Sequence, residues 1–170
     1  MNLKNHVTEV ANFPKPGILF YDISTILSDA KAWHYVIDSL AEIIAPQKPD
    51  LLAAVESRGF LLAAPLAYRM GLGYVMIRKR NKLPGRTVSF TYDLEYGNDT
   101  LEVQVDAFKA GQKIVIVDDL LATGGTLSAA IKLVRQCGAD VTLAAGIIEL
   151  LGLKGQARID VPFTSLIQYP

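Results

Sequence analysis

Several features that define whole classes of protein are missing from this chain of 170 residues. Cys137 is its only cysteine, so an intrachain disulfide framework is excluded. Lys plus Arg and Asp plus Glu each number 17, and the formal net charge of zero argues against a broad basic surface for nucleic acid. No apolar run reaches the roughly 18 residues that a membrane-spanning helix needs. We therefore expect a cytoplasmic protein with no nucleic-acid or membrane partner.

The common glycine motifs for nucleotides are absent as well. No Gly-Lys-Ser/Thr ending marks a Walker A loop, and the dinucleotide pattern G-x-G-x-x-G does not occur. What the chain has is a hydrophobic fraction of 51% in a length that suits one domain with a substantial core. Without repeats or low-complexity linkers, residues 1–170 are expected to form a single domain.

Short apolar runs alternate with helical patterns along most of the chain, which predicts an α/β fold with a central parallel sheet flanked by helices. From Thr87 the period changes to two, with a turn at 97–99, which predicts an antiparallel hairpin inserted into that pattern. Strands are expected at 51–55, 74–77, 114–117, 141–150 and 161–168, and helices at 33–44, 60–70 and 127–136.

The most informative stretch is residues 114–126, which read Ile-Val-Ile-Val-Asp-Asp-Leu-Leu-Ala-Thr-Gly-Gly-Thr. The apolar start predicts a strand buried on both faces. Asp118 and Asp119 then follow at its carboxyl end, where open α/β sheets place their ligands. These acids could hold sugar hydroxyls or a hydrated Mg²⁺, although the plain alternative is a pair of solvated loop acids.

The second half of this stretch predicts a phosphate cradle. Thr123 and Thr126 offer hydroxyls, and Gly124 and Gly125 let backbone N–H groups approach an anion. A helical pattern begins directly afterwards, and the start of a helix adds unpaired N–H donors and partial positive charge. A glycine-rich turn that only satisfies the geometry of a β-loop-α unit remains the alternative.

Two basic segments favour a second anion site at the same end of the sheet. Ser57 and Arg58 follow the strand expected at 51–55, and the planar fork of an Arg binds phosphate oxygens in pairs. Arg78, Lys79 and Lys82 lie in a basic loop before Pro84-Gly85, although a run of charge is also typical of a solvated loop.

Residues 114–126 resemble the phosphoribosyl-diphosphate (PRPP) signature of the type I phosphoribosyltransferases. The resemblance implies their fold, contact of the acids with the ribose hydroxyls, a 5′-phosphate at 122–126, and pyrophosphate at 57–58. It also implies Mg²⁺, held mainly by PRPP oxygens and waters, with Asp118 or Asp119 reaching it through water and no direct protein ligand. The implied contacts to PRPP or AMP are Ser57, Arg58, Arg78, Lys79, Lys82, Asp118, Asp119, Ala122, Thr123, Gly124, Gly125 and Thr126.

The resemblance also implies a non-proline cis peptide bond, which such pyrophosphate loops often contain. We expect it at Glu56–Ser57 or at Ser57–Arg58.

The proline-stiffened segment 12–23 resembles the N-terminal hood of the adenine-specific members of that family, although it could simply cover a sheet edge. Residues 1–30 would form this hood, and residues 78–105 a basic loop and hairpin that act as a lid. Matches to the same members include Leu94-Glu95-Tyr96-Gly97 and Lys154-Gly155.

These matches imply the residues that handle the base. Leu19 and Tyr21 would offer backbone groups to the edge of adenine, and Phe20 would stack on its face. Glu95 would act as the acid/base on the purine, and Arg58 would assist catalysis.

The expected function is therefore transfer of the 5-phosphoribosyl group from PRPP to adenine, giving AMP and pyrophosphate. The resemblance also implies a homodimer. Two alternatives stay open: a phosphoribosyltransferase for another base such as hypoxanthine, guanine or xanthine, and a non-catalytic regulator that senses PRPP.

Overall fold

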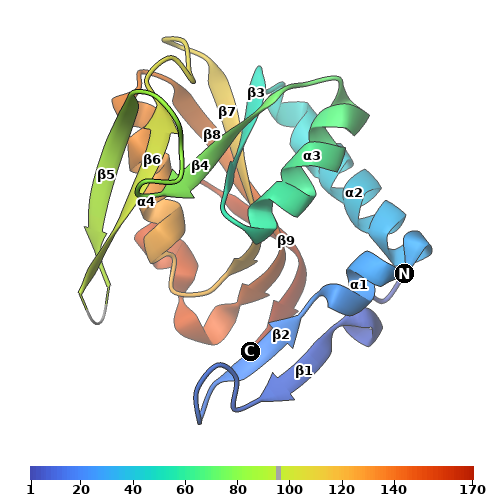
Figure 1. Cartoon of the computed structure of the whole chain (residues 1–170). Helices are drawn as coiled ribbons and strands as arrows, with labels where there is room; N and C mark the ends of the chain where they lie inside the picture. Colours follow the sequence, from blue (N-terminus) through green and yellow to red (C-terminus); the bar gives the residue numbers. More distant parts are fainter. Residues whose placement is uncertain (95–96) are drawn as a thin grey trace.

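A seven-stranded sheet forms the centre of the computed structural model, which describes residues 1–94 and 97–170 (Figure 1). Its strands in spatial order are β5 (Thr87–Asp93), β6 (Asn98–Gln104), β4 (Tyr74–Lys79), β3 (Leu51–Val55), β7 (Lys113–Leu121), β8 (Asp140–Leu150) and β9 (Phe163–Tyr169). The strands from β4 to β9 pair in parallel, whereas β5 and β6 form an antiparallel hairpin that joins the sheet through β4. The predicted parallel α/β fold with an inserted hairpin is confirmed.

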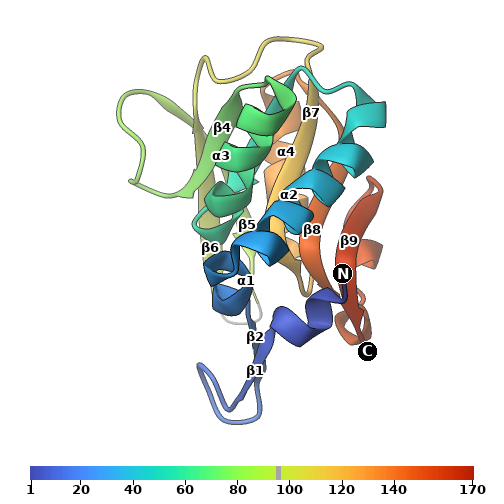
Figure 2. The same ribbon diagram turned by 90° about the vertical axis from the view of Figure 1, so that its right-hand side faces the viewer.

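Helices cover both faces of this sheet (Figure 2). On one face lie α1 (Ser24–Ser28), α2 (Ala30–Ile44) and α3 (Arg58–Met70), and on the other lies α4 (Gly125–Gln136). Because successive side chains of a strand point to opposite faces, Leu52 of β3 packs under α2 and α3, whereas Ala53 packs on the α4 side. No helix in the described part of the chain is long and apolar enough to cross a membrane. The short 3₁₀ helices are η1 (Leu3–His6), η2 (Ala45–Gln47), η3 (Leu151–Leu153) and η4 (Gly155–Arg158).

Several elements extend beyond their predicted limits. Strand β7 continues to Leu121 because it pairs with β8 as far as Leu121 and Glu149, so the two acids lie in the strand rather than in a loop. Strand β4 likewise reaches Lys79 through its pairing with β6. Asn98 and Asp99, which were expected in the hairpin turn, instead belong to β6 and pair with Asp93 and Tyr92 of β5.

The N-terminal segment forms a separate two-stranded antiparallel sheet of β1 (Thr8–Ala11) and β2 (Leu19–Asp22). The plain alternative, that this segment covers a sheet edge, stays open, because the ring of Tyr21 in β2 lies against Tyr169 of the edge strand β9. The hairpin projects beyond the end of the main sheet where β9 and the chain finish, at the bottom of Figure 1. Strand β5 also runs toward this end of the molecule, so the N-terminal hairpin and the β5–β6 pair flank the carboxyl ends of the parallel strands.

Candidate active site

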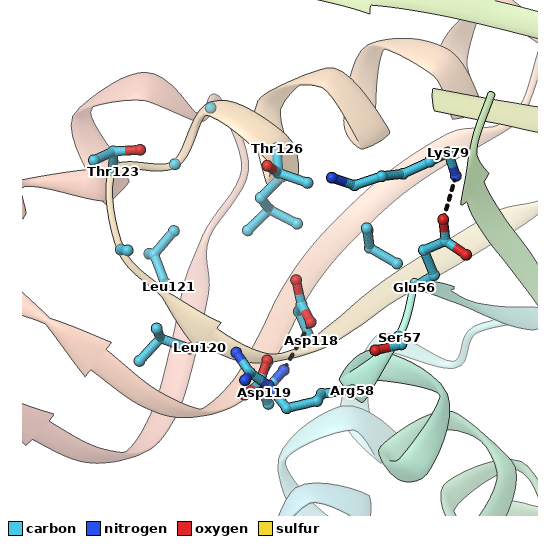
Figure 3. Close-up of a pocket in the computed structure, with 15 residues that line it drawn as sticks. Glu56, Ser57, Arg58, Lys79, Asp118, Asp119, Leu120, Leu121, Thr123 and Thr126 are labelled. Carbon is cyan, nitrogen blue, oxygen red and sulfur yellow. Dashed lines mark hydrogen bonds and ion pairs between the residues drawn. The ribbon is translucent and has the colours of Figure 1, made fainter. Parts of the chain in front are cut away.

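A cavity of about 550 Å³ opens at the carboxyl ends of β3 and β7 (Figure 3). Its walls come from three segments: residues 55–58 after β3, Lys79 at the end of β4, and residues 118–127. Parallel strands end at the same edge of a sheet, which is why segments so distant in sequence meet here. Figure 3 shows Asp118 between Thr126 on one side and Arg58 on the other.

The two acids have different partners. Asp119 is almost fully buried, and its Oδ2 lies 2.6 Å from Nε of Arg58. Asp118 accepts a hydrogen bond at Oδ1 from the backbone N–H of Asp119, at 2.9 Å. Burial first, and the charge of Asp119 second, raise the pKa of Asp118 well above its ordinary value. Asp118 would therefore gain from hydroxyl donors or a cation placed in the cavity.

Gly59 allows α3 to begin directly against the end of β7. A Cβ at this position would lie 2.9 Å from the carbonyl oxygen of Val117 and 3.2 Å from Oδ1 of Asp118. This close approach brings Arg58, the first residue of α3, to Asp119. The peptide bond between Glu56 and Ser57 is cis, which confirms the expectation for this loop.

Two helix N-termini border the cavity with free backbone donors. Neither α3 nor α4 has its first turn capped by a side chain from the described part of the chain. Gly124 precedes α4 in the left-handed conformation, with φ of 79°, which a residue with a side chain rarely adopts. The exposed N–H groups and the positive end of each helix favour anions at two separate points of one cavity.

The loop 122–126 is wedged between neighbours on both sides. A Cβ on Gly124 would clash with the carbonyl oxygen of Gly155, and a Cβ on Gly155 would clash with that of Ala122. On the other side, Oγ1 of Thr126 lies 3.2 Å from the hydroxyl of Tyr92 in β5. The shape of the loop therefore depends on η4 and on the inserted hairpin.

Of the three basic residues predicted in the loop before Pro84-Gly85, one lines the cavity and two do not. Lys79 lines the cavity, and its Nζ lies 2.9 Å from Oδ2 of Asp99, a hydrogen bond that raises the pKa of Lys79. Arg78 and Lys82 are not among the lining residues. The Nε of Arg78 binds Oε2 of Glu56 at 2.8 Å, and its Nη1 donates to the carbonyl oxygen of Lys82 at 3.0 Å.

Sequence reasoning missed Glu56 and Asp99 as partners of the basic residues. Oε1 of Glu56 accepts from the backbone N–H of Lys79 at 2.8 Å, which ties β4 to the loop after β3 (Figure 3). A signal for Glu56 was its place directly before Ser57 and Arg58, at the end of the strand expected at 51–55. No local pattern distinguishes Asp99, because its contact depends on pairing between β4 and β6.

The residues predicted to meet the base, Leu19, Phe20 and Tyr21, do not line the cavity wall, and Phe20 among them contacts a lining residue. The ring of Phe20 lies 5.3 Å from the guanidinium carbon of Arg58 and 5.0 Å from the ring of Phe13. The Tyr21 ring stacks 4.0 Å from that of Tyr169, so its side chain is engaged elsewhere. Leu19 is 43% exposed. The predicted acid/base, Glu95, lies outside the described residues.

Comparison with known proteins agrees with this geometry. A family model described as "Phosphoribosyl transferase domain" matches residues 22–161. Proteins named adenine phosphoribosyltransferase are 59% identical in Acidiphilium cryptum and 60% identical in Rhodospirillum rubrum, in each case over 169 residues that cover 99% of both chains.

Solved structures give the same result. The adenine phosphoribosyltransferase of Thermoanaerobacter pseudethanolicus is 49% identical, with a TM-score of 0.96 over 98% of both chains. The Saccharomyces cerevisiae enzyme, solved with an imino-altritol bisphosphate and adenine, is 39% identical, with a TM-score of 0.91 over 96% of both chains. The predicted resemblance is confirmed, and the chain belongs to the phosphoribosyl transferase domain family and, within it, to the adenine phosphoribosyltransferases.

Proposed function

We propose that the chain transfers the 5-phosphoribosyl group from PRPP to N9 of adenine, forming AMP and pyrophosphate for purine salvage. The observation that carries this proposal is one cavity in which an acid pair separates two uncapped helix starts. PRPP has matching chemistry, because a ribose with vicinal hydroxyls lies between a 5′-phosphate and a 1-pyrophosphate. The relatives are named for adenine, which supports the choice of base.

In this proposal the 5′-phosphate is bound by the backbone N–H groups of Ala122–Thr126 and the hydroxyls of Thr123 and Thr126. Asp118 and Asp119 accept hydrogen bonds from the ribose 2′- and 3′-hydroxyls. Because these bonds stabilise the charged carboxylate, binding would lower the raised pKa of Asp118. Ser57, Arg58 and Lys79 bind the pyrophosphate. Arg78 and Lys82 would support that end through Glu56 and the lid rather than from the cavity wall.

Mg²⁺ is proposed as the cofactor, bound through PRPP oxygens and waters. Among the described residues no cluster of three His, Cys, Asp or Glu side chains could hold a metal ion by itself. The donor set nevertheless fits an ion that keeps its waters, since Asp118 and Asp119 both line the cavity and the carboxylate of either can accept hydrogen bonds from them. Bound Mg²⁺ would share the neutralisation of the departing pyrophosphate.

The chemistry would depend on placing the base and the sugar together in an enclosed cavity. Phe20 stacks on the purine, and the backbone of Leu19 and Tyr21 meets its edge. As N9 attacks C1′ and the bond from C1′ to pyrophosphate breaks, Glu95 takes up the proton that adenine loses from N7 or N9. Arg58 stabilises the negative charge that develops on pyrophosphate. The hood of residues 1–30 and the lid of residues 78–105 would exclude water, which otherwise hydrolyses PRPP.

We also propose a homodimer in the cytoplasm, the location that a single cysteine favours. An exposed apolar surface supports the dimer: Tyr68 is 92% exposed and Leu61 44% exposed, and the two lie two helical turns apart on the same side of α3. Tyr74 and Met76 of β4 are exposed as well. They point to the face of the sheet that α3 covers, because the alternating residues Val75 and Ile77 pack on the α4 side. Light scattering during gel filtration should give twice the 18.5 kDa chain mass, and a monomer at working concentration would exclude this part of the proposal.

A panel of bases tests the reaction. The protein is incubated with PRPP, Mg²⁺ and adenine, hypoxanthine, guanine or xanthine, and nucleotide and pyrophosphate are quantified together. Adenine should give AMP and pyrophosphate in equal amounts, with kcat/KM at least about a hundredfold above the other bases. Preference for another base would favour the first alternative, and no turnover despite PRPP binding would favour a PRPP-sensing regulator.

A further inference from the structure

Glu149, near the carboxyl end of β8, is a buried acid outside the cavity wall. Its exposed fraction is 3%, and the ion pairs among the described residues do not include it. Its carboxylate accepts hydrogen bonds from Nε2 of Gln156 at 2.6 Å, Nε2 of Gln168 at 3.0 Å and Oγ of Ser165 at 3.5 Å. Burying a charge is costly, and these donors offset that cost.

Two features connect Glu149 to the loop 122–126, namely its place in the sheet and its hydrogen bond with Gln156. In the sheet Glu149 pairs with Leu121, the last residue of β7 before that loop. Gln156 follows Gly155 in η4, and Gly155 packs against the carbonyl oxygen of Ala122 so tightly that no Cβ fits. The carboxylate therefore holds η4 against the loop, whereas its other amide partner, Gln168, lies on β9, on the side of β8 opposite to β7 and the loop.

We propose that Glu149 is a positioning residue that sets the shape of the 5′-phosphate loop by holding Gln156. This inference rests on the proposed binding of the PRPP 5′-phosphate by residues 122–126. The carboxylate offers a separate oxygen to each amide NH₂, Oε1 to Gln156 and Oε2 to Gln168, whereas a Gln at position 149 would turn its own NH₂ toward one of them. The acid is thus matched to its two amide partners.

The two glutamines form a matched pair for the test. Gln156→Ala removes the donor on the loop side, and Gln168→Ala removes an equivalent donor on the β9 side. Loss of a hydrogen bond to a charged group should raise the KM for PRPP about tenfold in Gln156→Ala. The KM for adenine should stay within about twofold in both variants, as should the KM for PRPP in Gln168→Ala. Equal effects of the two variants on PRPP, or none in Gln156→Ala, would overturn the proposal.

Exchanging the side chains of Glu149 and Gln156 tests whether restoring their hydrogen bond also restores PRPP binding. Glu149→Gln alone should raise the KM for PRPP, whereas Glu149→Gln with Gln156→Glu restores a donor–acceptor pair between these positions. The double variant should bring that KM back to within about threefold of the starting protein. A double variant as poor as Glu149→Gln alone would contradict the positioning role, since a purely structural defect is not repaired by restoring this one bond.

A binding readout separates this inference from the proposed function. Ribose 5-phosphate titrated into the protein in a calorimeter reports the phosphate loop without any need for transfer to a base. If AMP is not formed by the starting protein, the proposed function fails, whatever the variants do. If ribose 5-phosphate binds equally to the starting protein and to Gln156→Ala, the positioning role of Glu149 fails by itself.

Discussion

A methyl group added at Gly155 tests how strictly the shape of the loop 122–126 determines PRPP binding. Gly155 is buried, and its φ is not positive, so alanine is compatible with the backbone itself. The added Cβ would lie 2.9 Å from Cγ and Cδ1 of Leu121 and closer still to the carbonyl oxygen of Ala122. The carbonyl belongs to the backbone of the loop, so the clash is relieved only when the loop or η4 moves.

The expected magnitudes follow from that geometry. Ordinary contacts lie at about 3.5 Å, so the loop must shift by roughly 1 Å. A misplacement of about 1 Å can cost about a hundredfold in a catalytic constant, and we expect this loss in kcat/KM, mainly through the KM for PRPP. Overpacking should also lower the free energy of unfolding by about 1–3 kcal/mol, or roughly 2–12 °C in Tm for a chain of this size.

Gly152→Ala is the matched control, in the neighbouring 3₁₀ helix η3. Its Cβ would lie 3.4 Å from the C and O atoms of Pro170, which is van der Waals contact, and it does not touch the loop. Initial rates with PRPP varied at saturating adenine, together with thermal melts, are the assay. A folded Gly155→Ala protein with an unchanged KM for PRPP would refute the reasoning, as would an equal loss in Gly152→Ala.

Three further changes test other parts of the site. Phe20→Ala should raise the KM for adenine about 5- to 100-fold through lost stacking and leave that for PRPP unchanged; an unchanged adenine KM would remove Phe20 from the base site. Glu95→Gln should lower kcat about a hundredfold or more with little change in PRPP binding, and normal turnover would refute the acid/base role. Because burial raises the pKa of Asp118, the folded state binds its proton more tightly than the unfolded state, and stability falls as pH rises from about 4 through that pKa. Asp118→Asn should therefore weaken PRPP binding but melt higher than the starting protein at pH 7, with the difference vanishing near pH 4; a lower Tm at neutral pH would contradict this account.

Much of the main sheet could be predicted because its signals are local. Residues 51–55 and 114–117 are apolar on both faces, and the structure buries them on both sides. The continuation of β7 to Leu121 could not be predicted, because the pairing with β8 that extends it is a long-range contact. Strand β1 was missed for a different reason: all four of its residues are exposed, so no hydrophobic alternation marks it.

In the site, too, some features could be predicted from local sequence and others depend on long-range contacts. The meeting of residues 57–58 with 118–126 followed from parallel strands that end at one edge of a sheet. Lys79 and Arg78 were indistinguishable in a basic run, yet alternation along β4 sends only Lys79 into the cavity wall. The contacts that connect Glu149 through Gln156 and Gly155 to the loop could not be predicted, because they depend on packing between separate elements and leave no periodic pattern in the sequence.

A crystal structure with bound AMP is the most direct test of the central claim that this cavity binds a sugar phosphate between two anion sites. We predict the 5′-phosphate on the backbone N–H groups of residues 122–126, the ribose hydroxyls on Asp118 and Asp119, and the adenine ring against Phe20. AMP bound outside the cavity, or with its phosphate against Arg58 and its base over the loop 122–126, would contradict the account.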